Sequence, residues 1–160
     1  TQALQKIPKF NSIKEVSSVS PIPLIRIYAK YPKDKSGKVW FHNLKRTITD
    51  SYIRHIIPID YDNGLIMISY TDGMYADMWS NLTKLGNRIL IEKLHSEVSK
   101  VLGITPPKPE FITYHYWSGG VHMWKPGQNI METYNKIKKP FSNEKIYIVN
   151  EAYSLHQCWV

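Results

Sequence analysis

The sequence predicts an α+β fold, in which a mixed, mostly antiparallel sheet of about five or six strands carries helices on one face. Three observations predict this class. Before Gly73, short runs rich in β-branched and aromatic residues alternate with turn signals, which is typical of strands joined by hairpins. After Gly73, apolar residues recur at helical spacing. Strand-like composition returns near residue 111, so the helices interrupt a sheet.

The length and composition fit one globular domain. The chain has 160 residues, of which 42% are hydrophobic and 21% are charged. A domain of this size buries roughly 68–70% of the surface of its unfolded chain. No apolar run approaches the roughly 20 residues that cross a bilayer, which argues against a membrane-spanning protein. The start has neither an initiating Met nor a signal-like pattern, so we expect Thr1 to mark a boundary within a longer protein.

The first segment of the chain predicts a connector and then a strand pair. Residues 1–20 are mostly polar and are expected to be a connector. Residues 22–31 have strand composition and end at Pro32, before a turn-forming stretch. We expect a short return strand at residues 39–41.

Two more strands are expected on either side of a tight turn. Residues 53–60 have strand composition, and Pro58 favours an edge or the end of a strand. The Asp62-Asn63-Gly64 sequence is a strong turn signal, and residues 65–70 form the next expected strand. For Asp60 and Asp62 we favour hydrogen bonds to the backbone of the turn over a paired-carboxylate catalytic role.

After Gly73, the apolar residues recur at helical spacing. It predicts helices over residues 74–82 and 87–102, with Gly103 in the C-terminal cap position of the second. A surface helix packed on the sheet should turn its apolar face inward and its charged face outward. The apolar face comprises Leu90, Leu94, Val98 and Val101, and the charged residues, mostly on the other face, are Glu92, Lys93, Glu97 and Lys100.

The last third of the chain is expected to add further strands to the sheet. Residues 111–117 have strand composition, and Ser118-Gly119-Gly120 is expected to end that strand. A short helix is expected over residues 130–137 and a final strand over 146–149. The α+β domain is therefore expected to cover residues 21–149.

Several chemistries lack their motifs in this sequence. None of the eight glycines falls into G-x-G-x-x-G or G-x-x-x-x-G-K-[ST], so the chain has no such nest for a pyrophosphate. No G-x-S-x-G nucleophile elbow occurs. His115 with His122, and His156 with Cys158, are the nearest pairings of metal-ligating residues, and no third ligand recurs at familiar spacing. We therefore expect no metal site.

Charge and cysteine content restrict the partners and the compartment. The formal charge is +8, but 17 of the 21 cations are Lys and only 4 are Arg, whereas bidentate recognition of phosphate favours Arg. This argues against nucleic-acid binding, which would weaken steeply as salt is added. Cys158 is the single cysteine, which excludes an internal disulfide and fits a reducing compartment such as the cytoplasm.

Aromatic side chains concentrate in the last third of the chain. They either pack in a core or line a slot for a flat ligand or a small cation, and both interpretations stay open at this point. The residues concerned are Tyr114, Tyr116, Trp117, Trp124, Tyr134, Tyr147, Tyr153 and Trp159.

Two segments carry a family resemblance. Residues 116–127 form an aromatic, glycine-rich stretch that ends in Pro-Gly, and residues 146–160 begin Ile-Tyr-Ile-Val-Asn-Glu. Together they resemble the C-terminal part of flavin-containing amine oxidases, a family that includes monoamine oxidases, polyamine oxidases and L-amino-acid oxidases. Residues 24–28 with Trp40, and residues 65–79, are similar to earlier substrate-domain elements of that family in the same order.

The resemblance implies a set of site residues. The fold would be like the substrate domain of these oxidases, and residues 150–160 would begin the motif that contacts the flavin. Trp159 would form one wall of the substrate cage, and Trp117, His122 and Trp124 would be further substrate-binding residues. The resemblance also implies contacts with FAD from Glu151, Asn150 and Trp159, and it assigns no catalytic residue to this chain.

The expected function follows from the resemblance. We expect the substrate-binding part of an FAD-dependent amine oxidoreductase that, in the full-length parent, oxidises a small-molecule amine to an imine. FAD and the FAD-binding domain of the same parent chain would be its partners, and this chain alone would be inactive and would not bind FAD. Val149 and Asn150 stand where the family has Ala-Gly, and Cys158 replaces its usual Gly. The alternative is therefore a catalytically degenerate structural or interaction module derived from the family.

Overall fold

The structure, a computed structural model, describes residues 2–157. The chain divides into two compact units. The first, called the central unit here, is Pro23–Trp117, and the second, the terminal unit, combines Thr1–Ile22 with Ser118–Val160. The region expected as one domain, residues 21–149, thus contributes to both units.

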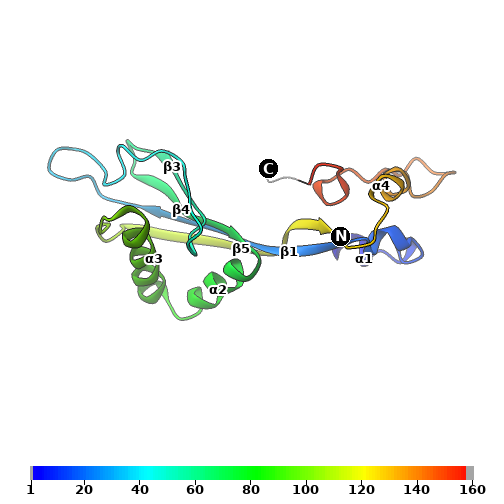
Figure 1. The fold of residues 1–160 in the computed structure, drawn as a ribbon, viewed down its shortest axis with the longest axis horizontal. Helices are drawn as coiled ribbons and strands as arrows, with labels where there is room; N and C mark the ends of the chain where they lie inside the picture. Colours follow the sequence, from blue (N-terminus) through cyan, green and yellow to red (C-terminus); the bar gives the residue numbers. More distant parts are fainter. Residues whose placement is uncertain (1, 158–160) are drawn as a thin grey trace. The chain divides into compact units, whose positions relative to one another are not determined.

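A five-stranded antiparallel sheet organises the chain and, with the helices, confirms the expected α+β class (Figure 1). The strand order is β2-β3-β4-β1-β5. At one end of the β1–β5 pair, the N–H of Glu110 donates to the carbonyl of Lys30 over 2.8 Å. At the other end, the N–H of Lys125 donates to the carbonyl of Ser18 over 2.9 Å. The strands are β1 (Val19–Lys30), β2 (Thr47–Ile48), β3 (His55–Asp60), β4 (Leu65–Asp72) and β5 (Phe111–Trp124).

Two helices cover one face of the sheet in the central unit. They are α2 (Gly73–Thr83) and α3 (Asn87–Leu102), and Figure 1 shows both on the same side of β4 and β1. α3 ends at Gly103, whose φ of 68° is left-handed, as expected of a glycine cap. The buried residues from helix and sheet form one core cluster, which includes Trp79, Leu90, Leu94, Val98, Ile25, Ile27, Ile66 and Ile68. The predicted inward direction of Leu90, Leu94 and Val98 is confirmed.

One member of the predicted charged face of α3 is buried. The side chain of Glu97 is only 2% exposed, and its Oε1 lies 2.8 Å from the ammonium groups of both Lys93 and Lys100. Burial raises the pKa of Glu97, but the hydrogen bonds and charges of the two lysines outweigh it, so that the pKa is lowered overall. The expectation that Glu97 faces solvent is wrong, because Glu97 follows Leu94 by three residues and so lies on the buried side of α3, where the two lysines pair with its carboxylate.

The opposite face of the sheet carries no helix in the central unit. Along β1, Ile25 and Ile27 point into the core, so the alternating residues Arg26 and Tyr28 point to the other side. In the register of β1 with β4, Arg26 is opposite Tyr70 and Tyr28 is opposite Met67. Polar and aromatic side chains therefore share the helix-free face.

The turn between β3 and β4 follows the sequence prediction. The carboxylate of Asp60 accepts hydrogen bonds from the backbone N–H of Asn63 at 2.9 Å and from its side-chain amide at 2.7 Å. These bonds lower the pKa of Asp60, as expected of a turn residue. Gly64 has a φ of 72°, and a Cβ there would lie 2.2 Å from the carbonyl oxygen of Tyr31, so no larger residue fits without a backbone shift.

The terminal unit is built from short elements at both ends of the chain. Its small core contains Phe10, Val16, Val19, Ile137, Ala152 and Tyr153. Asn129 caps α4, because its side-chain oxygen accepts from the N–H of Glu132. The elements are α1 (Gln2–Gln5), η1 (Pro8–Phe10), η2 (Lys14–Ser17), α4 (Ile130–Lys138) and η3 (Glu151–Tyr153).

Three expected strand features are wrong. Residues 39–41 lie in a turn and not in a return strand, although Val39 and Phe41 are buried and Trp40 packs edge-on against Tyr31. Their apolar character reflects packing of a loop onto the core rather than pairing in the sheet. Ser118-Gly119-Gly120 does not end the strand, because β5 continues through it to Trp124. Pairing with a long neighbour compensates for the weak strand preference of these residues.

The third incorrect strand is residues 146–149. This segment is extended but belongs to no strand among the described residues, and of its backbone N–H groups that of Ile148 donates to the carbonyl of Lys138 over 3.1 Å. Tyr147 and Val149 are 62% and 89% exposed. The composition of a strand is present, but a neighbouring strand is not found within residues 2–157.

Candidate functional site

An aromatic and cationic surface occupies the helix-free face of the central unit. The guanidinium carbon of Arg26 lies 4.8 Å from the ring centre of Tyr70 and 5.8 Å from the ring centre of Trp117. The ring of His115 lies 4.1 Å from that of Trp117, and the ring of His55 lies 5.8 Å from that of Tyr70. We call this surface, defined by Arg26, Tyr28, His55, Tyr70 and Trp117, the aromatic face.

Burial and neighbouring groups shift the pKa values of two residues of the aromatic face. Hydrogen bonding to Tyr70, and less strongly to Tyr28, raises the pKa of Arg26 against the opposing effect of burial. Burial lowers the pKa of His55, and the positive charges of Arg46 and Arg54 lower it further. Arg26 is therefore held in its charged form, and the charged form of His55 is disfavoured.

The terminal unit holds a second group of polar side chains. Nδ1 of His122 and Oε2 of Glu151 lie 3.1 Å apart, and the two side chains are 13% and 24% exposed. The backbone N–H of Trp124 donates to Oε1 of Gln157 over 3.1 Å, and the ring of Trp124 lies 6.3 Å from that of Tyr153. Residues 122–124 of β5 are thus joined to the segment that contains η3.

Asn150 has a structural role in the same segment. Its side-chain oxygen accepts from the N–H of Tyr153 over 3.3 Å and caps η3. The hydroxyl of Tyr153 donates to the carbonyl of Val16 over 2.8 Å, and burial raises the pKa of this tyrosine to about 12. This hydrogen bond joins the two ends of the chain within the terminal unit.

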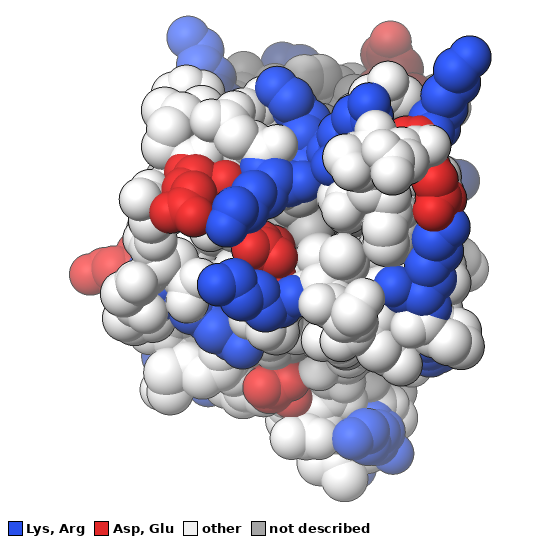
Figure 2. Space-filling model, turned by 90° about the vertical axis from the view of Figure 1, so that its right-hand side faces the viewer, with Lys and Arg blue, Asp and Glu red and all other residues white. Residues whose placement is uncertain are grey.

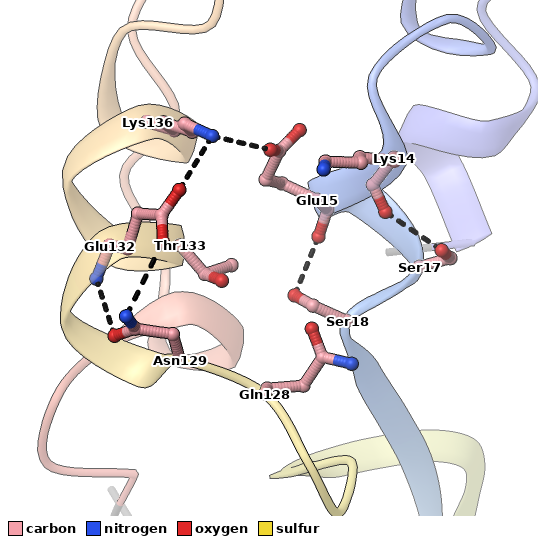
Figure 3. A pocket seen from close by; sticks show the side chains of 9 residues that line it. All are labelled: Lys14, Glu15, Ser17, Ser18, Gln128, Asn129, Glu132, Thr133 and Lys136. Carbon is pink, nitrogen blue, oxygen red and sulfur yellow. Dashed lines mark hydrogen bonds and ion pairs between the residues drawn. The ribbon is translucent and has the colours of Figure 1, made fainter.

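A polar cavity of about 400 Å³ also lies within the terminal unit, between η2 and α4 (Figure 3). The ammonium of Lys136 lies 2.8 Å from a carboxylate oxygen of Glu132 and 3.6 Å from one of Glu15. Sequence reasoning missed this cavity because its two walls are more than a hundred residues apart along the chain. The lining residues are Lys14, Glu15, Ser17, Ser18, Gln128, Asn129, Glu132, Thr133 and Lys136.

Positive charge on the terminal unit is interrupted by carboxylates. Lys9 pairs with Glu144, and Lys136 pairs with Glu132 and Glu15. Figure 2 shows one face of the molecule, on which Lys and Arg side chains lie among Asp and Glu side chains. Among the described residues, cations on this face are thus interspersed with carboxylates.

The structure places most of the predicted site residues. Trp117 belongs to the aromatic face of the central unit, whereas His122, Trp124, Asn150 and Glu151 lie together in the terminal unit. Trp159 and Cys158 lie outside the described residues. Sequence reasoning did not select Arg26, Tyr28 or Tyr70. The alternation of Arg26 and Tyr28 with buried isoleucines was a usable signal, but their neighbours depend on the strand register.

The residues assigned to FAD fit part of that cofactor. A carboxylate offers about four acceptor sites, so Glu151 can bind His122 and still accept from hydroxyl groups such as those of a ribityl chain. Asn150 uses its amide oxygen in the η3 cap and retains its amide N–H groups as donors. The sequence contains no glycine-rich phosphate nest of the two kinds sought, so the phosphates need a different polypeptide segment.

Comparisons with known proteins give no family for this chain. No protein-family model matches the sequence, and no curated protein matches it either. Among residues 2–157, no helix combines the length and the apolar character needed to cross a membrane.

Proposed function

We propose that this chain is the substrate-binding part of an FAD-dependent amine oxidoreductase, which oxidises a small-molecule amine to an imine in the full-length parent. The observation that carries the proposal is the aromatic face. The buried ring of Tyr70 and the partly exposed ring of Trp117 lie on the helix-free side of the sheet beside Arg26 and His55, and aromatic rings with a few placed polar groups are typical of the lining of small-molecule sites. Trp117, a substrate-binding residue implied by the family resemblance, belongs to this face.

The protein residues would bind and orient the amine. FAD, when bound, accepts the hydride equivalent from the carbon next to the amine nitrogen. The rings of Tyr70 and Trp117 would hold the apolar part of the substrate and exclude water from it. The family resemblance also implies substrate-binding roles for His122 and Trp124 of the terminal unit and for Trp159. This chain supplies orientation, and no proton-transferring residue is assigned to it.

Glu151 and Asn150 would supply the cofactor contacts of this chain. Because the phosphates must be held elsewhere, the proposal includes an FAD-binding domain of the same parent as the partner. Residues 146–149 support such a partner: an extended apolar segment with exposed Tyr147 and Val149 suits pairing with a strand of another domain. The single cysteine fits the proposed cytoplasmic location.

The test uses the full-length parent and this chain side by side. The parent should bind FAD and oxidise amines, whereas this chain mixed with FAD should retain none after gel filtration. Glu151→Gln in the parent should weaken FAD retention, because it removes a charged acceptor. Trp159→Ala should reduce amine turnover with little effect on the unfolding temperature. Stoichiometric FAD binding by this chain, or two variants that behave as the unmodified parent, would contradict the proposal.

A second candidate function is a structural or interaction module that has lost its redox activity. The observation that favours it is the use of Asn150 and Glu151 in internal contacts, with the Tyr153 N–H and with His122 respectively. A parent that neither binds flavin nor oxidises any amine would support this module over the enzyme.

A further inference from the structure

The two edges of the sheet formed by residues 2–157 differ in how they are protected against a further strand. β2, at one edge, has only two residues and directly follows the basic pair Lys45-Arg46. β5, at the other edge, has 14 residues, none of which is charged or proline. Short length, charged side chains and proline are features by which edge strands avoid pairing with other chains. β5 has none of these three protections.

Residues 111–117, the part of β5 within the central unit, expose aromatic rings on both faces of the sheet. Tyr116 packs against the central core, whereas Trp117 lies on the helix-free face. By the alternation of a strand, Tyr114 belongs to the same face as Tyr116, and Phe111 to the same face as Trp117. Phe111 is 58% exposed, Tyr114 40% and Trp117 37%. Large apolar side chains therefore surround an edge that pairs with no other strand in the described part of the chain.

Alternate residues of this edge turn their backbone groups away from β1. The carbonyl of Lys30 accepts from the N–H of Glu110, so the even-numbered residues in this part of β1, which include Arg26, face β5. Paired residues of neighbouring strands share a face of the sheet, and Trp117 shares the face of Arg26. The N–H and C=O of Trp117 therefore turn towards β1. The residues whose backbone groups turn outward are then Ile112, Tyr114 and Tyr116.

A second copy of this chain offers a strand that matches this edge. In an antiparallel pair, the outward groups of one strand meet the outward groups of the other, so a two-fold axis that relates two copies passes through a residue. An axis at Tyr114 opposes all of residues 111–117 and brings aromatic and aliphatic side chains together, which are stabilising cross-strand pairs. In this register the opposed residues are Phe111 with Trp117, Ile112 with Tyr116, Thr113 with His115, and Tyr114 with its own copy.

Charge favours the chain's own strand as the occupant of this edge. Residues 111–117 carry no formal charge, and at their start Lys30 and Glu110 form an ion pair of 3.0 Å. An acidic strand would find no cation along this edge, and a basic strand would find no carboxylate. The chain has a formal charge of +8, but pairing through this strand opposes none of its lysines or arginines to one another.

We propose that a second copy of this chain pairs with residues 111–117 in antiparallel register, across a two-fold axis at Tyr114. The sheet then continues through both copies. On the helix-free side, Phe111 of the second copy lies beside Trp117, so each copy adds one ring to the aromatic face of the other. The pairing depends neither on an amine nor on FAD. A dimer that oxidises no amine would overturn the proposed function alone, and a monomeric oxidase would overturn the pairing alone.

The test measures the association state of this chain by sedimentation velocity over a range of micromolar concentrations. The unmodified chain should form a dimer. Tyr114→Lys should weaken dimerisation by about tenfold or more, because it sets two like charges opposite one another and removes a pair of rings. Tyr147→Lys is the matched control, since Tyr147 is 62% exposed and lies outside β5, and it should leave the dimer unchanged. A monomer at every concentration, or equal weakening by the two variants, would overturn the pairing.

A mixture of two variants tests the register. Tyr114→Glu should weaken dimerisation as Tyr114→Lys does, whereas an equimolar mixture of the two should associate at least about tenfold more tightly than either alone, because opposite charges then face each other. This gain also distinguishes a lost interface from a failure to fold, since unfolded variants would not recover. A mixture that associates no better than its components would overturn the axis at Tyr114.

The position of Phe111 has its own readout. The NMR signal of the Trp117 indole N–H should shift as the concentration of the unmodified chain rises, because a ring of the second copy comes to lie beside it. Phe111→Leu keeps an apolar side chain, so it should retain the dimer and lose most of this shift. An undiminished shift in Phe111→Leu would show that Phe111 of the second copy does not lie beside Trp117.

Discussion

The two compact units differ in how completely they bury their own apolar residues. In the central unit, the sheet and two helices enclose a continuous core that includes Trp79, Leu94 and Ile66, each at most 1% exposed. In the terminal unit, the core is smaller, and the strand-like segment 146–149 packs on it only through Ile146 and Ile148, with Tyr147 and Val149 at 62% and 89% exposure.

The two units also differ in whether their strand-like segments are paired. The strands of the central unit pair with one another in one sheet, which carries the aromatic face. The terminal unit combines two distant parts of the chain and contains an extended segment without a β partner among the described residues. We therefore expect most of the stability of this chain to reside in the central unit.

The largest loss of stability is expected from Trp79→Ala. Trp79 is fully buried, and its indole N–H donates to the carbonyl of Tyr52 over 2.8 Å. Removing a buried tryptophan costs about 3–5 kcal/mol of unfolding free energy. Urea denaturation followed by circular dichroism measures this, and a loss below about 1 kcal/mol would show that the central core does not dominate stability.

Leu94→Ala should cause the next largest loss of stability. Leu94 is 1% exposed on the inward face of α3, so its truncation should cost about 2–5 kcal/mol. Leu85→Ala is the matched control, because Leu85 is 63% exposed and should change stability by no more than about 0.5 kcal/mol. Equal thermal shifts in the two variants would remove α3 from the core.

In the terminal unit, Tyr153→Phe should have a smaller effect. The variant loses the hydrogen bond from the tyrosine hydroxyl to the carbonyl of Val16 while keeping the ring, at a cost of about 0.5–1.5 kcal/mol. Tyr147→Phe is the control, since Tyr147 is 62% exposed. A Tyr153→Phe effect as large as that of Trp79→Ala would contradict the contrast between the units.

The smallest expected effect is the pH dependence that a histidine of the central unit gives to the stability. His95 is half-buried, with its Nε2 2.9 Å from the hydroxyl of Tyr31, and burial lowers its pKa in the folded state. The unfolded chain therefore binds a proton first, near its ordinary pKa of about 6.5. Stability from this group is complete above that pH and decreases as the pH falls below it towards the lower, folded pKa.

The measurement compares the free energy of unfolding at neutral pH and at about pH 5. His95→Gln keeps a hydrogen-bonding group for Tyr31 but removes the titration, so its stability should fall less over this range than that of the unmodified protein. His55 contributes in the same direction in both proteins, because burial and two arginines lower its pKa. Identical pH profiles would show that His95 is not protected from protonation.

The sequence predicted less of the candidate site than of the fold. The segment around His122 and Glu151 was selected by its resemblance to a family, and the structure brings these two side chains to 3.1 Å. Arg26 was not selected. Its chemistry depends on Tyr70 and Trp117, which approach it only through the register of β1 with β4 and through the proximity of β5.

The sequence by itself determined the α+β class, the extent of α3, the inward side chains Leu90, Leu94 and Val98, and the cap at Gly103. Each of these depends on spacing along the chain or on the conformational preference of one residue. Only the tertiary structure decided that residues 39–41 and 146–149 form no strand and that β5 runs through Ser118-Gly119-Gly120. The reason is physical: a helix satisfies its backbone hydrogen bonds within its own segment, whereas a strand exists only where another strand lies beside it.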